Sequence, residues 1–580
     1  MLYTLSKYYN LKKYIPWSLA LLLCTSLYAE TLSSTIGAKS INDSIFTLEG
    51  NGGIDVTAYD LDIHWDNKTE HIKGEATLNI KTTQKLSAFS LDFHGLKVTS
   101  ITVDTVPVKF SRNKDKLLIV LPKLLETDIS FTLTVHYEGK PSEVSEEESV
   151  SAGWHTVEEG ARALSEPNSA KNWFPCNNHP RDKAVYTFHI TVPKAYDVVA
   201  NGMPQKSIHT KTSTTYQFRT REPMASYLTL ISIGHYDREV LKAKDGTPIY
   251  NYYYKGIALK DKEVFAPQAD IMAFFSEKFG AYPFASAGIV ASEGESILAY
   301  ETQTRPFFGT PTSEQMLAHE LAHQWFGDLV SLDEWKESWL KEGFATYSAA
   351  LWFEHKQGKD YMGKWVKGTF ESLMGIQRLP KGNMSKMLKA FEIKERILSS
   401  DEVIKLIDMG TKGKTEAEPL KRALAHIPKE GISSYKLDAV FKEMSFPYFD
   451  LIFNQYVDFM NIISGEKSEN SISFDDLVAT LGEAPRDVHT LSQIYSSGVY
   501  ARGALAMHAL RIKVGDTKFF NILQTYFKRY KNSHANSTDF EAIATEVSKE
   551  NLDDFFKAWL EDKLIPDIPK YGLYKKNYAK

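Results

Sequence analysis

The segment MLAHELAHQWFGD, residues 316–328, contains the pattern H-E-x-x-H, formed by His319, Glu320 and His323. A spacing of four residues places both imidazoles on one face of a helix, one turn apart. Two neutral imidazoles so placed can bind one Zn²⁺, and Glu320 between them can reach a zinc-bound water. With 16 histidines in the chain, chance predicts only about 0.03 matches to this pattern. The segment therefore predicts a helix that carries a metal site.

A catalytic zinc has three protein ligands and keeps one position open for water or substrate. The segment that follows, EWKESWLKEGFATYSAALW (334–352), has a second helical pattern with several acids. Glu342 is the candidate third ligand, since 18 residues separate it from His323 and allow one helix to end and another to pack back. Spacing alone does not choose between Glu342 and the acids nearer in the chain, which are Asp333, Glu334 and Glu337.

Upstream of this segment, apolar and polar residues alternate, as in residues 59–65, 129–137 and 186–192. A period of two indicates strands with one buried face. Glycine and proline residues separate these runs, which is typical of turns between strands. From about residue 265 onward the period moves toward 3.6, and we expect that part of the chain to be mainly helical.

The composition limits the class of protein. Of 580 residues, 43% are hydrophobic and 24% are charged, which is ordinary for a globular chain of several domains. The formal charge is −5 with no polybasic block, so we expect no nucleic-acid partner. Only Cys24 and Cys176 are present, which excludes a disulfide scaffold, and we expect Cys176 to be a buried small side chain.

The first 29 residues have the order of a secretory signal peptide. Lys7, Lys12 and Lys13 precede the apolar run IPWSLALLLCTSLYA, which ends at Ala29. The run is shorter than the roughly 20 residues of a spanning helix. We therefore predict an exported protein, periplasmic or secreted, with no membrane contact beyond the alternative of an uncleaved N-terminal anchor.

Several segments resemble the gluzincin zinc aminopeptidases, the family typified by aminopeptidase N and leukotriene hydrolase. The resemblance begins with H-E-L-A-H-Q-W-F-G-D and W-L-K-E-G-F-A-T-Y, and the chain is similar to a short bacterial-type member. It extends to NWFPCNNHPRDKAVYTFHITVP (172–193), EPMASYLTLISIGHYD (222–237) and VYARGALAMHALRIKVGD (499–516). Apart from one interior stretch, it covers nearly all of the chain after the signal peptide.

The resemblance implies a role for each matching residue. Glu342 becomes the third ligand of one zinc per chain, and Glu320 the general base that later protonates the leaving amine. Tyr500 is implied to donate a hydrogen bond to the oxyanion. Glu301 and Glu166 are implied to bind the α-ammonium of a peptide substrate. The segment around Glu301 reads L-A-Y-E-T, so it departs from the family's G-x-M-E-N motif.

The implied fold is multidomain α+β: an N-terminal antiparallel β domain, a thermolysin-like, mainly helical catalytic domain and a short helical C-terminus. The predicted boundaries are a signal peptide over 1–29, the β domain over 30–236 and the first catalytic part over 237–369. A helical insertion over 370–485 and the Tyr500 helix with the C-terminal helices over 486–580 complete the chain. We predict the insertion because Glu342 and Tyr500 are separated further than the resemblance suggests; it either caps the substrate channel or only adds surface.

The resemblance implies a zinc-dependent aminopeptidase that hydrolyses N-terminal residues from peptides by attack of a zinc-bound water. The alternatives are a leukotriene-hydrolase-like epoxide hydrolase, a thermolysin-type endopeptidase and a non-catalytic peptide-binding protein. The presence of the complete ligand set and of Tyr500 argues against the last alternative, and the amine-binding acids argue against an endopeptidase. Around the metal, Asp328 either orients a zinc-binding histidine or is a surface acid.

Overall fold

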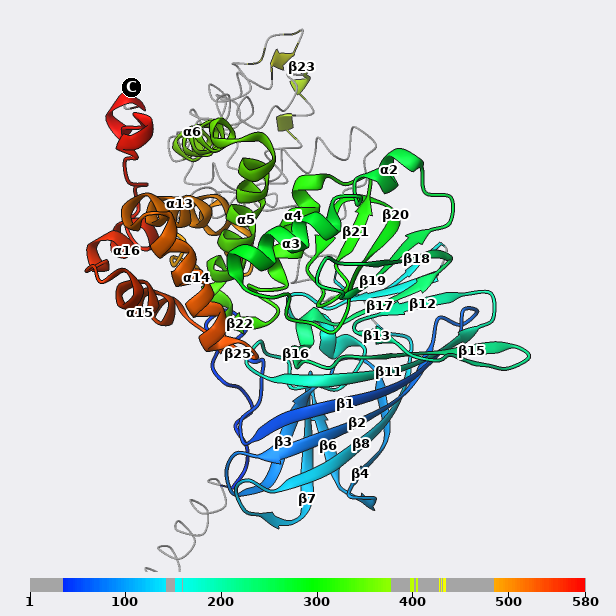
Figure 1. The fold of residues 1–580 in the computed structure, drawn as a ribbon. Coiled ribbons are helices and arrows are strands. Elements are labelled where there is room, and N and C mark those ends of the chain that lie inside the picture. The colour runs from blue at the N-terminus through cyan, green and yellow to red at the C-terminus, as the bar shows by residue number, and fades with distance from the viewer. Residues whose placement is uncertain are drawn as a thin grey trace, which may run out of the picture.

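The computed structural model describes residues 35–141, 152–158, 160–376, 397–400, 403–404, 427, 429, 431–433 and 484–578. The predicted signal peptide lies outside the described residues, and so does most of the predicted insertion over 370–485. Figure 1 shows a β-rich N-terminal part, in blue and cyan, that leads into a mainly helical part in green, orange and red.

The largest sheet of the N-terminal part is built from the strands with alternating sequence. Its main strands run in the order β15-β11-β1-β2-β8-β4. All of these neighbours are antiparallel except β1 and β11, which are parallel. In β1, Tyr59, Leu61 and Ile63 are buried, while Asp60 and His64 are exposed, as the period of two predicts. The strands are β1 (Ile54–Trp65), β2 (Ile72–Thr82), β4 (Lys97–Val103), β8 (Ser130–Gly139), β11 (Lys183–Pro193) and β15 (Ser213–Arg219).

Two smaller antiparallel sheets complete this β domain. The first has the order β3-β7-β6, and the second has the order β12-β17-β10-β9 and leads toward the catalytic part. The strands of the first are β3 (Leu86–Asp92), β6 (Phe110–Asn113) and β7 (Lys116–Leu125). Those of the second are β9 (Gly153–Val157), β10 (Gly160–Leu164), β12 (Asp197–Ala200) and β17 (Leu230–Gly234).

The catalytic part begins with a sheet of its own in the order β18-β19-β20-β21. Two of its strands, β20 and β21, lie beyond residue 265, where the sequence predicts mainly helix. The sequence did not predict these strands because their apolar runs are too short to show a clear period. The strands are β18 (Tyr236–Lys242), β19 (Pro248–Tyr254), β20 (Ala287–Tyr300) and β21 (Phe307–Thr310). The helices that follow or flank this sheet are α3 (Gln268–Phe279), α4 (Glu314–His323), α5 (Trp339–Gln357) and α6 (Lys359–Ile376).

The C-terminal part is helical, as predicted, and packs beside α5 (Figure 1). A short parallel pair, β22 (Val330–Leu332) with β25 (Ser533–Ala535), ties it to the chain that follows α4. Its helices are α13 (Gly503–Val514), α14 (Asp516–Tyr530), α15 (Ser537–Ser548) and α16 (Asp553–Leu560). Within the described ranges, no helix has both the length and the apolar character that crossing a bilayer requires.

The core around the two motif helices is rich in aromatic side chains. Trp325, Trp335 and Trp339, which flank the two motif helices, are buried, so they serve packing. Cys176 is a buried free thiol, as the sequence predicts. These buried side chains hold the segments that carry the candidate site in fixed positions.

Candidate active site

Helix α4 carries both histidines of the H-E-x-x-H pattern. It begins after Ser313, whose side-chain oxygen accepts a hydrogen bond from the backbone N–H of Met316 at 3.1 Å and caps the helix. Leu317 and Leu321 are buried on its core side. Because the core side is fixed in this way, the 3.6-residue period fixes the direction of the histidine side chains as well.

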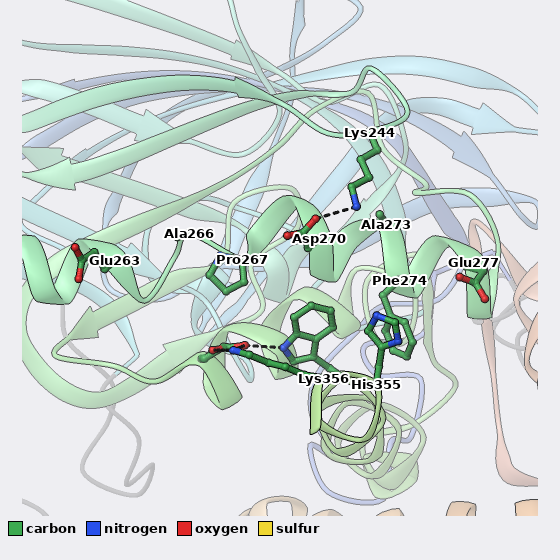
Figure 2. Close-up of a pocket in the computed structure, with 12 residues that line it drawn as sticks. Lys244, Glu263, Ala266, Pro267, Asp270, Ala273, Phe274, Glu277, His355 and Lys356 are labelled. Atoms are coloured by element: carbon green, nitrogen blue, oxygen red, sulfur yellow. Dashed lines mark hydrogen bonds and ion pairs between the residues drawn. The ribbon is translucent and has the colours of Figure 1, made fainter. Parts of the chain in front are cut away.

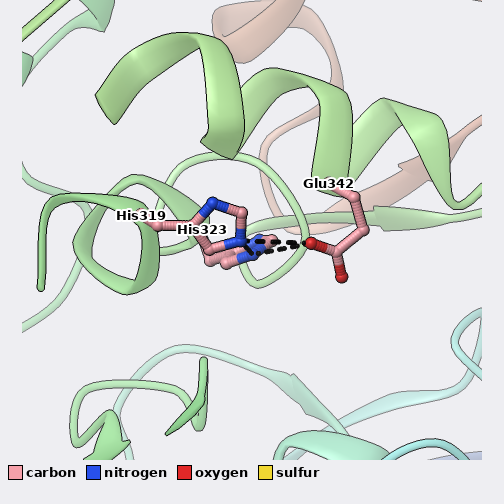
Figure 3. Close-up of side chains that lie close together, drawn as sticks. All are labelled: His319, His323 and Glu342. Atoms are coloured by element: carbon pink, nitrogen blue, oxygen red, sulfur yellow. Dashed lines mark hydrogen bonds and ion pairs between the residues drawn. The ribbon is translucent and has the colours of Figure 1, made fainter. Parts of the chain in front are cut away.

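Three nitrogen and oxygen atoms meet at one point between α4 and α5 (Figure 3). His319 Nε2 lies 3.1 Å from His323 Nε2 and 3.2 Å from Glu342 Oε2. The distance from His323 Nε2 to the same Glu342 oxygen is 3.4 Å. The structure therefore brings together the three residues that the sequence analysis proposes as zinc ligands.

These distances fit a zinc ion. Zinc binds imidazole and carboxylate at about 2.0–2.2 Å in a tetrahedron, so the ligand atoms of one ion stand about 3.3–3.5 Å apart. The three measured separations, 3.1, 3.2 and 3.4 Å, are within about 0.2 Å of that range. Two imidazoles and one carboxylate are also the donor set of a catalytic zinc with one open position. Both the spacing and the chemistry of this site suit zinc.

A backbone carbonyl orients His323. Its Nδ1 lies 3.1 Å from the carbonyl oxygen of Phe326, which can only accept a hydrogen bond. Nδ1 therefore carries the proton, and Nε2 offers its lone pair to a metal. Asp328, which the sequence suggested for this role, is buried, and its two carboxylate oxygens have no hydrogen-bond partner among the described residues. The group that orients His323 is the Phe326 carbonyl, and Asp328 fits neither predicted alternative, since it is buried and is not a surface acid.

The other acids that competed with Glu342 on spacing lie elsewhere. Asp333 pairs with Arg181 and His534, each at 2.9 Å. Glu337 accepts a hydrogen bond from the backbone N–H of Ser537 at 3.1 Å. Glu334 lies 3.1 Å from Lys336. Only α5, which packs directly on α4, brings a carboxylate of this set to the histidines.

A second cluster of acids adjoins the histidines. Glu166 follows β10 of the N-terminal β domain, and Glu301 follows β20 of the catalytic sheet. Carboxylate oxygens of Glu166, Glu301 and Glu342 lie within 4.8 Å of one another. Glu301 and Glu320 also lie within this distance of a ring nitrogen of His323. The two acids proposed to bind an α-ammonium are thus adjacent to the candidate metal ligands.

Lys341 lies at the centre of this cluster. Its Nζ donates to Glu166 Oε1, Glu301 Oε1 and Glu342 Oε1, in each case at 2.6 Å. Only 1% of its side chain is exposed, and its Nζ also lies 5.9 Å from the centre of the Tyr227 ring. No sequence motif predicts a role for Lys341, although its position next to the proposed ligand Glu342 is a signal that could have identified it.

Burial and the Lys341 ammonium control the charges of the cluster. Burial alone lowers the pKa of Lys341, but the three carboxylates outweigh it and hold the pKa well above its usual value. Burial of Glu342 acts to raise its pKa, yet Lys341 and then His323 hold it well below its usual range. Burial, followed by the charges of Glu301 and Glu342, raises the pKa of Glu320. A dication at the histidines acts in the opposite direction and favours ionised Glu320.

The segment that carries Tyr500 is a single π-helical turn, Gly498–Arg502, directly before α13. The Tyr500 ring lies parallel to the imidazole of His319, with ring centres 5.9 Å apart. Tyr500 therefore lies beside one of the candidate metal ligands. Burial raises the pKa of Tyr500 well above its usual value, so the hydroxyl remains a hydrogen-bond donor at neutral pH.

Two glycines allow α5 and α13 to approach closely. A Cβ atom on Gly343 would lie 3.0 Å from the backbone of Gly503, and one on Gly503 would lie 3.2 Å from the Cα of Gly343. Arg502 then secures the turn from the other side, because its buried guanidinium donates to the carbonyls of Trp559 and Ala558 at the end of α16. These contacts fix Tyr500 relative to Glu342.

Gln324 secures the loop that carries Glu301. Its Nε2 donates to the carbonyl of Glu301 at 3.1 Å, and its Oε1 accepts from the backbone N–H of Thr304 at 2.7 Å. The residue that follows the second histidine thus connects the metal helix to the acid cluster. The altered L-A-Y-E-T segment therefore still holds Glu301 against the site.

A separate cavity of about 890 Å³ lies along α3 and the end of α5 (Figure 2). Its lining includes none of the candidate site residues. Two of its acids are paired with lysines, Asp270 with Lys244 at 2.9 Å and Glu314 with Lys356 at 2.7 Å. It does not contain the zinc-type donor set, which lies between α4 and α5.

Curated proteins with similar sequences include aminopeptidases. Glutamyl aminopeptidase of Homo sapiens is 30% identical over 214 residues, which cover 33% of this chain and 22% of that protein. Leucyl aminopeptidase of Saccharolobus solfataricus is 24% identical over 321 residues, or 51% of this chain and 38% of that protein. The matched segments span less than two-fifths of the length of these relatives.

Solved structures share the fold. An M1 zinc metallopeptidase from Deinococcus radiodurans superposes with a TM-score of 0.67 at 24% identity, covering 91% of this chain and 98% of that chain. A mutant of that enzyme bound to a Tyr-Ser-Ala substrate gives the same TM-score and covers 99% of its own chain. The predicted order, a β domain followed by a helical catalytic domain, is therefore confirmed.

Family comparison covers both parts of the molecule. The Peptidase M1 N-terminal domain matches residues 56–228, and the Peptidase family M1 domain matches residues 265–417 and 429–559. The second match includes much of the stretch that we predict to be an insertion, and α6 continues past the proposed boundary at residue 369. The boundaries thus stay predictions. The two matches together show that the chain belongs to peptidase family M1, the family that its motifs predicted.

Proposed function

We propose that this protein is a zinc-dependent aminopeptidase that removes N-terminal residues from peptides. The observation that carries the proposal is the triangle of His319 Nε2, His323 Nε2 and Glu342 Oε2, with Glu166 and Glu301 beside it. The first three residues supply a catalytic zinc donor set, and the last two supply acids for a substrate ammonium. Membership of peptidase family M1 and similarity to curated aminopeptidases support this combination.

Zinc at these ligands supplies the polarisation that makes water a nucleophile at neutral pH and activates the scissile carbonyl. Glu320 accepts the proton of the attacking water and passes it to the leaving amine. Tyr500, which lies beside His319, donates its O–H to the carbonyl oxygen as negative charge develops there. The histidines and Glu320 come from α4, Glu342 comes from α5, and Tyr500 comes from the turn before α13, so the reaction requires the packing of these three segments.

Exopeptidase specificity comes from the acid pair. Glu166 and Glu301 bind the free α-ammonium of the peptide and thereby place the first peptide bond at the metal. An acetylated peptide brings no positive charge, so the acids receive no new cation from it and binding is weaker. This difference separates an aminopeptidase from an endopeptidase with the same metal site.

The test uses the purified full-length protein on a panel of aminoacyl fluorogenic amides, each assayed with and without a chelator. We expect hydrolysis that the chelator abolishes and added zinc restores. Each active amide is then compared with its N-acetyl form, which we expect to be a poor substrate. Equal cleavage of free and acetylated substrates would contradict the exopeptidase assignment, and chelator-resistant hydrolysis would contradict the role of zinc.

We also propose that the protein is exported, on the basis of the basic and apolar order of residues 1–29. Cell fractionation and N-terminal sequencing of the exported form test this proposal. We expect a periplasmic or secreted product that begins at Glu30. Recovery of an uncleaved form in the membrane pellet would favour the N-terminal anchor.

A further inference from the structure

The ammonium of Lys341 binds the same two acids that the proposed function assigns to a substrate ammonium. A primary ammonium has three N–H donors. Lys341 directs its Nζ to three carboxylates at 2.6 Å each, and two of these belong to Glu166 and Glu301. A peptide α-ammonium has the same charge and the same number of donors. Lys341 engages one oxygen, Oε1, of each of these two acids, so a substrate ammonium competes with it for the negative charge of the same carboxylates.

Lys341 is held in this position by its surroundings. The side chain is almost fully buried, and its Nζ lies 5.9 Å from the centre of the Tyr227 ring. A Cβ atom on Gly327, in the turn after α4, would lie 3.2 Å from the Cβ of Lys341, so the base of the lysine is closely packed. The lysine is also tethered to α5, which keeps its ammonium at a high effective concentration beside the acids.

We propose that Lys341 is a specificity-determining residue that competes with the α-ammonium of a free-amine substrate for Glu166 and Glu301. This inference rests on the proposed function, because it takes Glu166 and Glu301 as the amine-binding acids. When only a minor fraction of the protein is in the binding-competent form, the apparent affinity for the ligand is the intrinsic affinity multiplied by that fraction. Lys341 thus weakens the binding of free-amine ligands and leaves ligands without an ammonium unaffected.

A structural counter-ion is the competing explanation for the same contacts. Three buried carboxylates beside one another require a cation, and Lys341 supplies it. In that case removal of the lysine lowers stability and gives no gain in ligand affinity. The two explanations therefore differ in the sign of the effect on binding, which an equilibrium measurement determines without any catalytic turnover.

The variant Lys341→Met removes the ammonium and keeps an unbranched side chain of similar length. Isothermal titration of the zinc-loaded protein with L-phenylalanine amide measures the effect, with N-acetyl-L-phenylalanine amide as the matched probe. Both titrations use the Glu320→Gln background, so that the ligands are not hydrolysed. We expect the free amide to bind at least tenfold more tightly than in the Lys341-containing protein, and the acetylated amide to change by less than twofold.

A second variant protects the test against failure to fold. Lys341→Gln removes the positive charge and keeps both amine-binding acids, while its amide N–H groups can still donate to the buried carboxylates. We expect this variant also to bind the free amide more tightly than the Lys341-containing protein, and Lys341→Arg, which keeps the cation, to retain weak binding. Unchanged or weaker binding of the free amide in both lysine-free variants overturns the inference.

Steady-state kinetics separate this inference from the proposed function. With Glu320 present, we expect Lys341→Met to lower KM for aminoacyl amides at least tenfold with a smaller change in kcat. If the wild-type protein shows chelator-sensitive aminopeptidase activity but neither KM nor affinity responds to Lys341→Met, only the inference fails. If the wild-type protein has no such activity but the free amide binds more tightly after the substitution, only the proposed function fails.

Discussion

Glu342 presents a single carboxylate oxygen to His319, with Oε2 at 3.2 Å from His319 Nε2. Its other oxygen, Oε1, is directed to Lys341 Nζ. The carboxylate therefore has one oxygen available for a metal and one engaged by an ammonium. Monodentate binding of this kind suits a tetrahedral zinc with an open fourth position.

Substitution of Glu342 tests the ligand set directly. We expect Glu342→Ala to reduce bound zinc from one per chain to well below one after dialysis, because two imidazoles alone do not hold the ion tightly. Elemental analysis of the dialysed protein measures the stoichiometry. Glu334→Gln is the matched control from the same segment and should keep one zinc. Full zinc occupancy in Glu342→Ala would show that another residue is the third ligand.

Glu320→Gln separates metal binding from proton transfer. The amide cannot accept the water's proton, so we expect kcat to fall by about 10²–10⁴-fold, the usual contribution of a positioned general base. Zinc content should stay at one per chain, since Glu320 is not a member of the His319–His323–Glu342 ligand group. Turnover close to the wild-type rate in a zinc-loaded variant would exclude Glu320 as the base.

Tyr500→Phe removes one hydroxyl and keeps the ring that lies parallel to His319. Loss of one oxyanion donor lowers kcat by about 10²–10³-fold in comparable sites. We expect that loss with little change in KM, because the hydrogen bond forms mainly in the transition state. The measurement is a full kinetic curve with one aminoacyl amide, alongside a thermal melt that should remain unchanged. A rise in KM alone would instead make Tyr500 a substrate-binding residue.

Gly343→Ala places a methyl group against the backbone of Gly503 at 3.0 Å. Overpacking at such a contact costs about 1–3 kcal/mol of stability and separates α5 from the Tyr500 turn. We therefore expect a lower free energy of unfolding and a lower kcat. Gly368→Ala in α6 is the matched control, because a Cβ there meets no atom within 4 Å. That variant should be unchanged or stabilised by up to about 1 kcal/mol. Equal behaviour of the two variants would refute the close contact.

Asp182 gives the fold a pH dependence that is remote from the metal site. Burial raises its pKa from 3.8 to about 8. Its Oδ1 has no partner among the described residues, while Oδ2 accepts from Asn177 Nδ2 at 2.6 Å. Between pH 4 and 8 the folded protein therefore keeps a proton that the unfolded chain has lost. The free energy of unfolding falls as pH rises in this window, by up to about 1.4 kcal/mol per unit.

The variant Asp182→Asn should remove this part of the slope. Denaturant unfolding between pH 4.5 and 6.5 measures this slope. The upper limit is chosen because burial lowers the pKa of Lys183 to about 7, so that Lys183 contributes to the pH dependence at higher pH. Asp237→Asn, at an exposed strand position, is the control and should keep the wild-type slope. An identical slope in wild type and Asp182→Asn would mean that Asp182 is ionised in the folded state.

Local sequence patterns determined the elements of this protein. The period of two over residues 59–65 corresponds to β1, and the four-residue spacing of His319 and His323 to one face of α4. Such patterns can be predicted because neighbouring residues alone decide which side chains share a face. The strands β20 and β21 are an exception, since their short apolar runs have no distinctive period.

Only the tertiary structure decided which distant residues share the site. Sequence spacing alone allowed any of four acids to be the third ligand. The packing of α5 on α4 brings Glu342 to the histidines. Glu166 belongs to the β domain and pairs with Lys341 of α5, although the two residues are far apart in the sequence. The physical reason is that ligand geometry and ion pairing depend on distances of a few ångströms across helix and domain contacts. The H-E-x-x-H motif thus determined that the site can bind a metal, and the tertiary packing placed the ammonium of Lys341 beside the metal ligands.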